Sequence, residues 1–169
     1  MNDASVPPED PAAGDPAAGD PAAGGPAAGG PAGAARRAVE ALYADDRAAQ
    51  ALGIEMLEVA PGHVRVAMTV RPDMLNGHGT CHGGFLFALA DTAFAYACNS
   101  HGQAMVAAGA SIEFLAPCAG GERLIATASE TSRAARHGIY DVAVAKDSGE
   151  LRAHFRGRCA RLRVPSATP

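Results

Sequence analysis

NGHGTCHGGFLFALADTAFAYACN, residues 76–99, is the stretch that decides the fold of this chain. A loop rich in Asn, Gly and His leads through His82-Gly83-Gly84 into a segment that is apolar on nearly every side. One carboxylate, Asp91, interrupts the apolar residues in the middle of the segment. We predict a helix over about 82–99, and a helix that is apolar all round must be surrounded by other structure.

Two strands are predicted before this helix. Residues 54–60 and 63–71 flank Pro61-Gly62, a dipeptide typical of turns, so the pair is expected to form a hairpin. The second run alternates as half-buried strands do, and its apolar face carries Val64, Val66, Met68 and Val70.

Four more strands are predicted after the helix, over about 104–115, 122–132, 138–146 and 150–163. A short helix is expected over 36–50, ended by Gly53. Because the strands follow one another through short turns, the sheet should be mostly antiparallel. The predicted class is therefore α+β.

The central helix also predicts an oligomer. One sheet covers only one side of an apolar helix, so the simplest solution is a curved sheet that wraps the helix while a second subunit covers the rest. We expect an obligate dimer at least.

The chain divides into three parts by composition. Residues 1–35 contain a repeat of Pro, Ala, Gly and acid, which lacks large apolar side chains and is predicted to be disordered. Residues 36–164 are expected to form one domain, and 165–169 a frayed end. Residues 36–169 hold 14 basic and 13 acidic residues, a balance that gives no general attraction to nucleic acid.

The remaining bulk features point to the cytoplasm. No apolar run reaches the length of a membrane span, and no signal peptide is predicted at the start. The cysteines, which are Cys81, Cys98, Cys118 and Cys159, lie far apart without a CxxC pair. This spacing indicates reduced thiols in a cytoplasmic protein.

Asp91 and the glycine turn are the candidate catalytic groups. Burial would raise the pKa of Asp91 and make its carboxylate a better base near neutral pH. The first N–H groups of a helix have no internal partners, and glycines at 83 and 84 would let a ligand oxygen approach them closely. Asn76 could orient a substrate carbonyl or a water, or simply form a turn, and His82 could be a base or hold the loop.

Two other kinds of site are weighed against this one. His78, Cys81 and His82 are close in sequence, and Cys118 or Cys159 could complete a metal site, but the spacing matches no usual zinc pattern. A Cys81 nucleophile paired with His82 lacks a nearby orienting acid. No metal and no cofactor are therefore expected.

Residues 76–99 strongly resemble the hotdog-fold acyl-CoA thioesterases, and most closely those of the PaaI type from phenylacetic acid degradation. Three later pieces also resemble that subgroup: 111–117 (SIEFLAP), 138–142 (GIYDV) and 155–157 (FRG). The resemblance covers about residues 38–163. It implies an antiparallel sheet wrapped around one long helix, paired into a dimer and then a tetramer.

The resemblance also implies an activity. The substrate would be an acyl-CoA thioester, hydrolysed to acid and coenzyme A, with an aryl- or arylacetyl-CoA such as phenylacetyl-CoA or hydroxyphenylacetyl-CoA as the leading choice. Asp91 of one subunit would act as general base or nucleophile, facing the turn of the other, where the Gly83 or Gly84 amide polarises the carbonyl. Asn76 would place substrate or water, and His82 would support the loop.

This chain departs from the family pattern at the position that would help to hold the attacking water. Some relatives carry a Ser or Thr on the following strand, where this chain has Ala107-Ala108, so Thr92 would have to supply the hydroxyl. For the phosphates of coenzyme A, Arg133 or Arg136 is the expected contact, since phosphates need basic partners.

Two other functions remain open on the same scaffold. A non-catalytic acyl-CoA binding or sensing protein would be expected to lack the acid or the glycines. A hotdog dehydratase or hydratase would use His82 and Asp91 on the carbon chain of the substrate instead.

Overall fold

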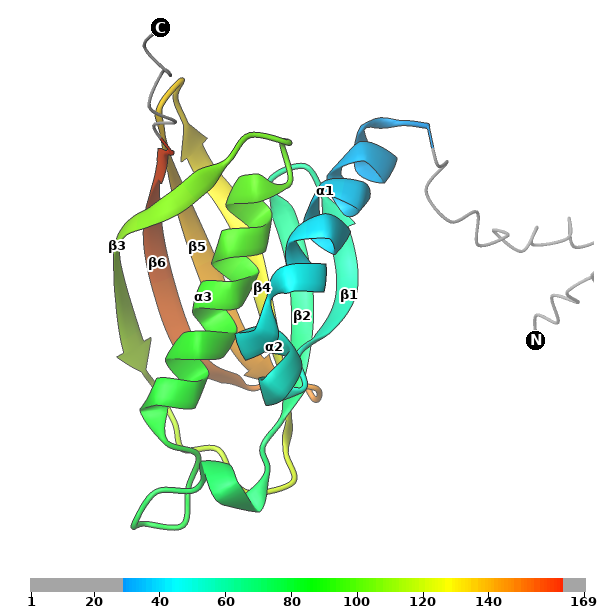
Figure 1. Ribbon diagram of the computed structural model, residues 1–169. Coiled ribbons are helices and arrows are strands. Elements are labelled where there is room, and N and C mark those ends of the chain that lie inside the picture. Colours follow the sequence, from blue (N-terminus) through cyan, green and yellow to red (C-terminus); the bar gives the residue numbers. More distant parts are fainter. Residues whose placement is uncertain (1–28, 163–169) are drawn as a thin grey trace, which may run out of the picture.

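A long helix lies against the inner face of a curved sheet and sets the architecture of the molecule (Figure 1). The computed structural model describes residues 29–162. Its helices are α1 (Pro31–Asp45), α2 (Arg47–Leu52) and the central α3 (Gly83–Asn99), with a 3-10 turn, η1 (Pro72–Met74), before α3. Its strands are β1 (Glu55–Ala60), β2 (His63–Thr69), β3 (Met105–Phe114), β4 (Arg123–Arg133), β5 (His137–Lys146) and β6 (Leu151–Arg161).

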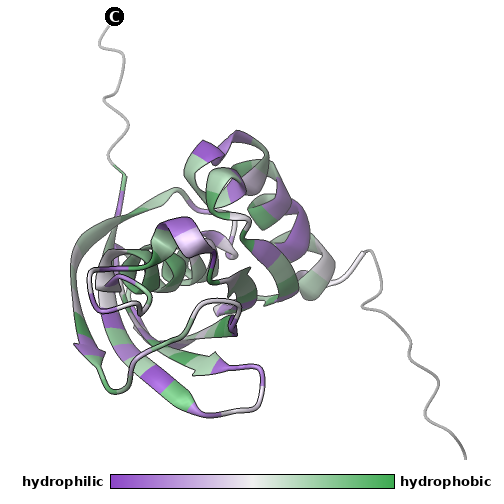
Figure 2. Cartoon of the chain, turned by 90° about the horizontal axis from the view of Figure 1, so that it is seen from below, coloured by the Kyte–Doolittle hydropathy of each residue, from purple (hydrophilic) through white to green (hydrophobic). Residues whose placement is uncertain are grey.

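All neighbouring strands of the sheet are antiparallel, in the order β1-β2-β4-β5-β6-β3. The hairpin of β1 and β2 and the four later strands are therefore confirmed, each within a few residues of its predicted bounds. The sheet curves around α3 when the molecule is viewed from below (Figure 2). Within the described chain, β1 and β3 are the two edges, which leaves one side of β3 without a paired strand.

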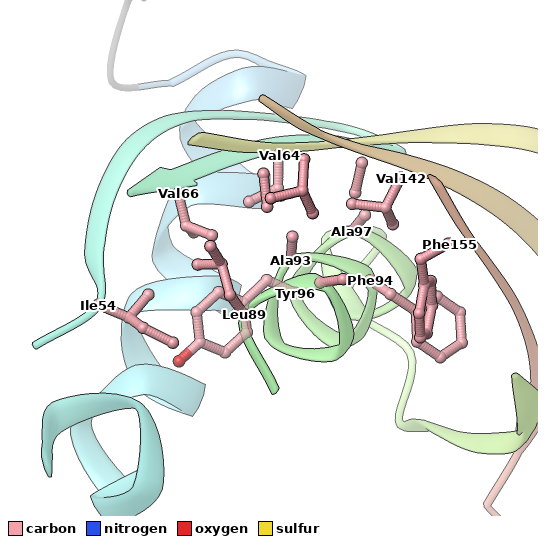
Figure 3. Close-up of a cluster of buried hydrophobic side chains, with 14 of the residues drawn as sticks. Ile54, Val64, Val66, Leu89, Ala93, Phe94, Tyr96, Ala97, Val142 and Phe155 are labelled. Atoms are coloured by element: carbon pink, nitrogen blue, oxygen red, sulfur yellow. The ribbon is translucent and has the colours of Figure 1, made fainter. Parts of the chain in front are cut away.

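The core lies between α3 and the sheet (Figure 3). The rings of Phe94 and Phe155 have centroids 5.8 Å apart, and Tyr140 stands edge-on to Phe94 at 5.7 Å. Gly157 on β6 makes room for this cluster, because a Cβ there would come within 2.8 Å of the Phe94 ring. The predicted inner face of the second strand is also confirmed, with these residues buried: Val64, Val66, Met68 and Val70.

The first helix differs from the prediction at both ends. It begins at Pro31, where the fixed φ of proline suits the first helical turn, and its Ala35 is buried. It stops at Asp46, whose side chain accepts a hydrogen bond of 2.9 Å from the Ala49 N–H and so starts a separate helix, α2. The expected domain boundary at 35/36 thus falls inside α1, while residues 1–28 and 165–169 lie outside the described residues.

Candidate active site

The turn before α3 is held by His82, which is the N-cap of the helix. Its Nδ1 accepts a hydrogen bond of 2.9 Å from the Gly84 N–H, and its own N–H donates to the Met74 carbonyl at 2.9 Å. The predicted supporting role of His82 therefore has a physical basis. The hydrogen bond from Gly84 to His82 also distinguishes the two glycines. The Gly84 amide is engaged, whereas the Gly83 amide has no hydrogen-bond partner within residues 29–162.

Asn76 organises the loop that precedes the turn. Its Oδ1 accepts from the backbone N–H groups of His78 at 2.9 Å and Thr80 at 3.3 Å. Its Nδ2 donates to Thr80 Oγ1 at 3.2 Å, which leaves a second N–H on the same nitrogen. The side-chain oxygen is thus used for structure, and the amide nitrogen is the part of Asn76 that can still reach a ligand.

Asn76 and Gly83 line one surface hollow of about 450 Å³. Its apolar wall comes from Leu86, Phe114, Leu115 and Pro117, among others. The Phe114 ring lies directly over Gly83, since a Cβ at residue 83 would be 2.9 Å from Phe114 Cζ. The structure therefore brings the predicted amide donor and the predicted orienting amide together in one hollow.

Asp91 lies in a different cleft, of about 370 Å³, between α3, α1 and the start of β3. The carboxylate is half-buried and makes no hydrogen bond or ion pair with any residue in the described part of the chain. Burial raises the pKa of Asp91 above its usual range. Most of the cleft is apolar, with Leu42, Ala95 and Val106 among its walls, so an accessible base faces a mainly apolar space.

The two halves of the site are separate within one chain. Gly83 and Asp91 are eight residues apart on the same helix, which corresponds to about 12 Å along its axis. They line different hollows, and no residue lines both. A single protomer therefore cannot place one carbonyl group against both the Gly83 amide and the Asp91 carboxylate.

The remaining predicted site residues lie around these hollows. Thr92 is half-buried on α3 beside Asp91 but is not among the residues that line the Asp91 cleft, whereas Ala107 is. Arg133 Nη2 donates to Gln103 Oε1 at 3.0 Å, just beyond the C-terminal end of α3. Arg136 is exposed in the turn between β4 and β5.

The cysteine and metal alternatives find little support in the geometry. Burial raises the pKa of the Cys81 thiol to about 11, and that thiol contacts the His82 carbonyl at 3.7 Å. Because a nucleophilic cysteine must be a thiolate, this environment favours a structural cysteine. No group of three or more His, Cys, Asp or Glu side chains within residues 29–162 is arranged to hold a metal ion.

Sequence reasoning missed the contribution of α1 to the Asp91 cleft. Leu42, Asp45 and Asp46 all line it. Asp46 is fixed there because it also accepts a hydrogen bond of 3.0 Å from the hydroxyl of buried Tyr96. The sequence predicted a helix over 36–50, but nothing in it indicated which part of α3 that helix would meet.

Two similarities in sequence identify the family. The Thioesterase superfamily matches residues 78–153. Acyl-coenzyme A thioesterase PaaI of Escherichia coli K12 is 47% identical over 122 residues, which cover 72% of this chain and 87% of that protein. The chain belongs to the PaaI-type hotdog thioesterases.

The solved structures agree with this assignment to the PaaI-type hotdog thioesterases. The E. coli PaaI protein from the phenylacetic acid degradation operon matches with a TM-score of 0.78 and 43% identity, covering 79% of this chain and 97% of that one. The TT0310 protein of Thermus thermophilus matches with a TM-score of 0.67 and 44% identity, covering 69% of this chain and 98% of that one. The hotdog fold and thioester hydrolase class expected from residues 76–99 are thereby confirmed.

No helix in the described residues is both long and apolar enough to cross a membrane.

Proposed function

We propose that this protein hydrolyses an aryl- or arylacetyl-CoA, of the phenylacetyl-CoA or hydroxyphenylacetyl-CoA class, to the free acid and coenzyme A. The observation that carries the proposal is the Asp91 carboxylate, which has no partner among the described residues and faces a mainly apolar cleft in a PaaI-type chain. E. coli PaaI is an acyl-coenzyme A thioesterase from the phenylacetic acid degradation operon.

Asp91 supplies the base in this reaction. With its pKa raised by burial, the carboxylate accepts a proton from water more readily than an exposed aspartate would. The water oxygen then bonds to the thioester carbon, the carbon–sulfur bond breaks, and the proton passes to the departing thiolate of coenzyme A. Direct attack by Asp91 on the carbonyl is the alternative use of the same position.

The Gly83 amide polarises the carbonyl. It is the first N–H of α3, at the positive end of the helix dipole, and it has no partner in the described chain. Of the two glycines in the turn, Gly83 is the better donor because His82 already occupies the Gly84 amide. The free N–H of Asn76 lies in the same hollow and helps to orient substrate.

A homodimer completes the site, with Asp91 of one protomer against the Gly83 turn of its partner, and we expect two dimers to form a tetramer. Two observations support the dimer. The distance between Gly83 and Asp91 along α3 prevents one chain from supplying both groups to one carbonyl. The unpaired edge at β3 exposes apolar residues, including Val106 (45% exposed) and Phe114 (54% exposed). A two-fold axis would cover this face and create two equivalent sites.

A basic side chain from the turn between β4 and β5, or from the end of β4, would receive the phosphates of coenzyme A. Arg136 is exposed, whereas Arg133 already donates to Gln103. We therefore place Arg136 first and Arg133 second. Coenzyme A is part of the substrate, and the reaction as proposed needs no other cofactor. The four cysteines are all free and buried, which supports a reducing compartment such as the cytoplasm.

The test is release of free thiol from phenylacetyl-CoA by wild type, Asp91→Asn and Asp91→Ala. We expect turnover by wild type and a loss of several hundred-fold or more, on the order of a catalytic base, in both variants. Thiol release by the variants at the wild-type rate would refute the role of Asp91. Absence of turnover by wild type across aromatic and aliphatic thioesters would favour a binding protein instead.

The shared site has its own test by complementation. Asp91→Asn protomers are mixed, through unfolding and refolding, with Gly83→Pro protomers, each inactive alone. If the two groups come from different subunits, half of the randomly formed dimers are mixed, each with one intact site, and about one quarter of wild-type activity returns. No recovery, with mixed dimers shown by differential tagging, would place both groups in one chain.

A further inference from the structure

Leu42 of α1 separates the Asp91 cleft from a second hollow. This hollow, of about 260 Å³, is lined by Ala38, Leu42, Asn99, Gly102 and Gln103. Leu42 and Asn99 line both spaces, and Leu42 is the apolar side chain of the two. At 39% exposed, the Leu42 side chain is placed over the boundary rather than packed into the core.

The two spaces follow one another along α3. Asp91, Ala95 and Asn99 occupy successive turns on one face of the helix, and the eight residues from first to last span about 12 Å. Ala38 and Leu42 form the matching face of α1, since residues four apart lie on one side of a helix. A group extending from a carbonyl at Asp91 toward the end of α3 therefore passes Ala95 first and then meets Leu42.

The polar groups of the second hollow are mostly engaged. The Asn99 Nδ2 donates to the Ala95 and Met105 carbonyls, and its Oδ1 accepts from the Met105 N–H at 3.0 Å. The Gln103 side-chain carbonyl oxygen accepts from Arg133. With these groups occupied, the hollow suits a hydrocarbon chain better than the amide-rich arm of coenzyme A.

We infer that Leu42 is a specificity-determining residue that limits the length of the acyl group. In this assignment, which rests on the proposed function, a short aromatic acyl group fills the Asp91 cleft and ends at Leu42. A longer group needs the second hollow, and the Leu42 side chain blocks its way. Truncation of Leu42 joins the two spaces without touching Asp91 or the glycine turn.

The experiment compares wild type with Leu42→Ala on two thioesters, phenylacetyl-CoA and 6-phenylhexanoyl-CoA, which has four more methylenes. Leu57→Ala is the matched control, because Leu57 on β1 is 37% exposed and lines none of the three hollows. We expect Leu42→Ala to raise the ratio of kcat/KM for the long substrate over the short one by about 10-fold or more, while Leu57→Ala leaves it unchanged.

One result would overturn the inference. A ratio within about two-fold of wild type would show that Leu42 does not limit acyl length. If that unchanged ratio comes with an equal change in kcat/KM for both substrates, Leu42 contacts the coenzyme A portion, which they share. Leu42→Phe provides the opposite perturbation, and we expect it to lower the ratio; a Leu42→Ala chain that fails to fold therefore does not end the test.

A binding measurement distinguishes failure of this inference from failure of the proposed function. The S-alkyl thioethers of coenzyme A corresponding to the two substrates cannot be hydrolysed, and their affinities are measured by calorimetry. If no thioester is turned over, the proposed hydrolysis fails, yet a preference of Leu42→Ala for the longer thioether still supports the length limit. An unchanged preference would refute the length limit whether or not hydrolysis occurs.

Discussion

The amide of Gly83 can be removed while leaving the helix in place, which allows its contribution to be measured. Gly83 is the first residue of α3, and proline is favoured at that position because its nitrogen needs no helical partner. The preceding residue, His82, has φ −65° and ψ 133°, an extended conformation that proline requires of its neighbour. Gly83→Pro should therefore fold and lose only the N–H.

Gly83→Ala is the matched control. Both substitutions add a Cβ that meets Phe114 Cζ at 2.9 Å, so both require the same small movement of that ring. Because the two variants share this contact, its effect cancels when they are compared. The alanine variant keeps the N–H, and the native structure shows no hydrogen bond from it within the described chain that proline would break. The difference between the two variants therefore isolates the amide donor.

The expected difference is large. Removal of one donor to a developing oxyanion lowers kcat by about 100- to 1,000-fold. That range corresponds to about 3–4 kcal/mol of transition-state stabilisation. We expect Gly83→Ala to retain measurable turnover and Gly83→Pro to fall below it by this factor, with KM changed much less.

The assay is thiol release from phenylacetyl-CoA at saturating substrate, with thermal unfolding to show that both variants are folded. Equal kcat values for the proline and alanine variants, within about three-fold, would refute the assignment, since the donor would then have to lie elsewhere.

Three further changes test the local chemistry. Because burial raises the pKa of Asp91, kcat/KM should fall on acidification through a pKa above that of an ordinary aspartate. The same shift means that the folded chain binds this proton more tightly than the unfolded chain does, so the charged carboxylate opposes folding at neutral pH. Asp91→Asn should therefore raise Tm at pH 7, and this gain should vanish below the ordinary carboxyl pKa. His82→Ala should cost about 1 kcal/mol in urea unfolding through loss of the cap on Gly84, whereas His82→Asn should retain most of it, and equal losses would contradict the capping role. Tyr96→Phe should cost about 2 kcal/mol in the same measurement, because it removes the buried hydroxyl that donates to Asp46; an unchanged midpoint would show that this bond adds nothing.

The sequence predicted most of the fold because its periodicities are clear. Strict alternation at Val64, Val66 and Met68 indicated a strand with one buried face, and the structure buries those side chains. The long apolar run after His82 could only be a surrounded helix. Strand order was less accessible, since β3 pairs with β6 at the edge rather than with its neighbour in sequence, and pairing over that distance leaves no local pattern.

The site was partly readable for similar reasons. An acid within an apolar helix, and glycines before it, are local signals, and both occur in the positions predicted. The sequence could not predict that the Gly84 amide is hydrogen-bonded while the Gly83 amide has no partner in the described chain, because this difference depends on the rotamer of the His82 ring. The position of Leu42 between two hollows likewise depends on how α1 packs against α3, a contact between segments some fifty residues apart that composition does not reveal.

The packing of α3 against the sheet also limits how the spacing between Gly83 and Asp91 can change. Burial of one face, through residues such as Leu89 and Phe94, fixes the rotation of the helix about its axis and hence the direction in which Asp91 points. Inserting one residue between Gly83 and Asp91 would turn the acid by about 100° about the helix axis, away from its cleft between α1 and β3. The number of residues between Gly83 and Asp91 therefore cannot change by single steps without moving the carboxylate out of its cleft.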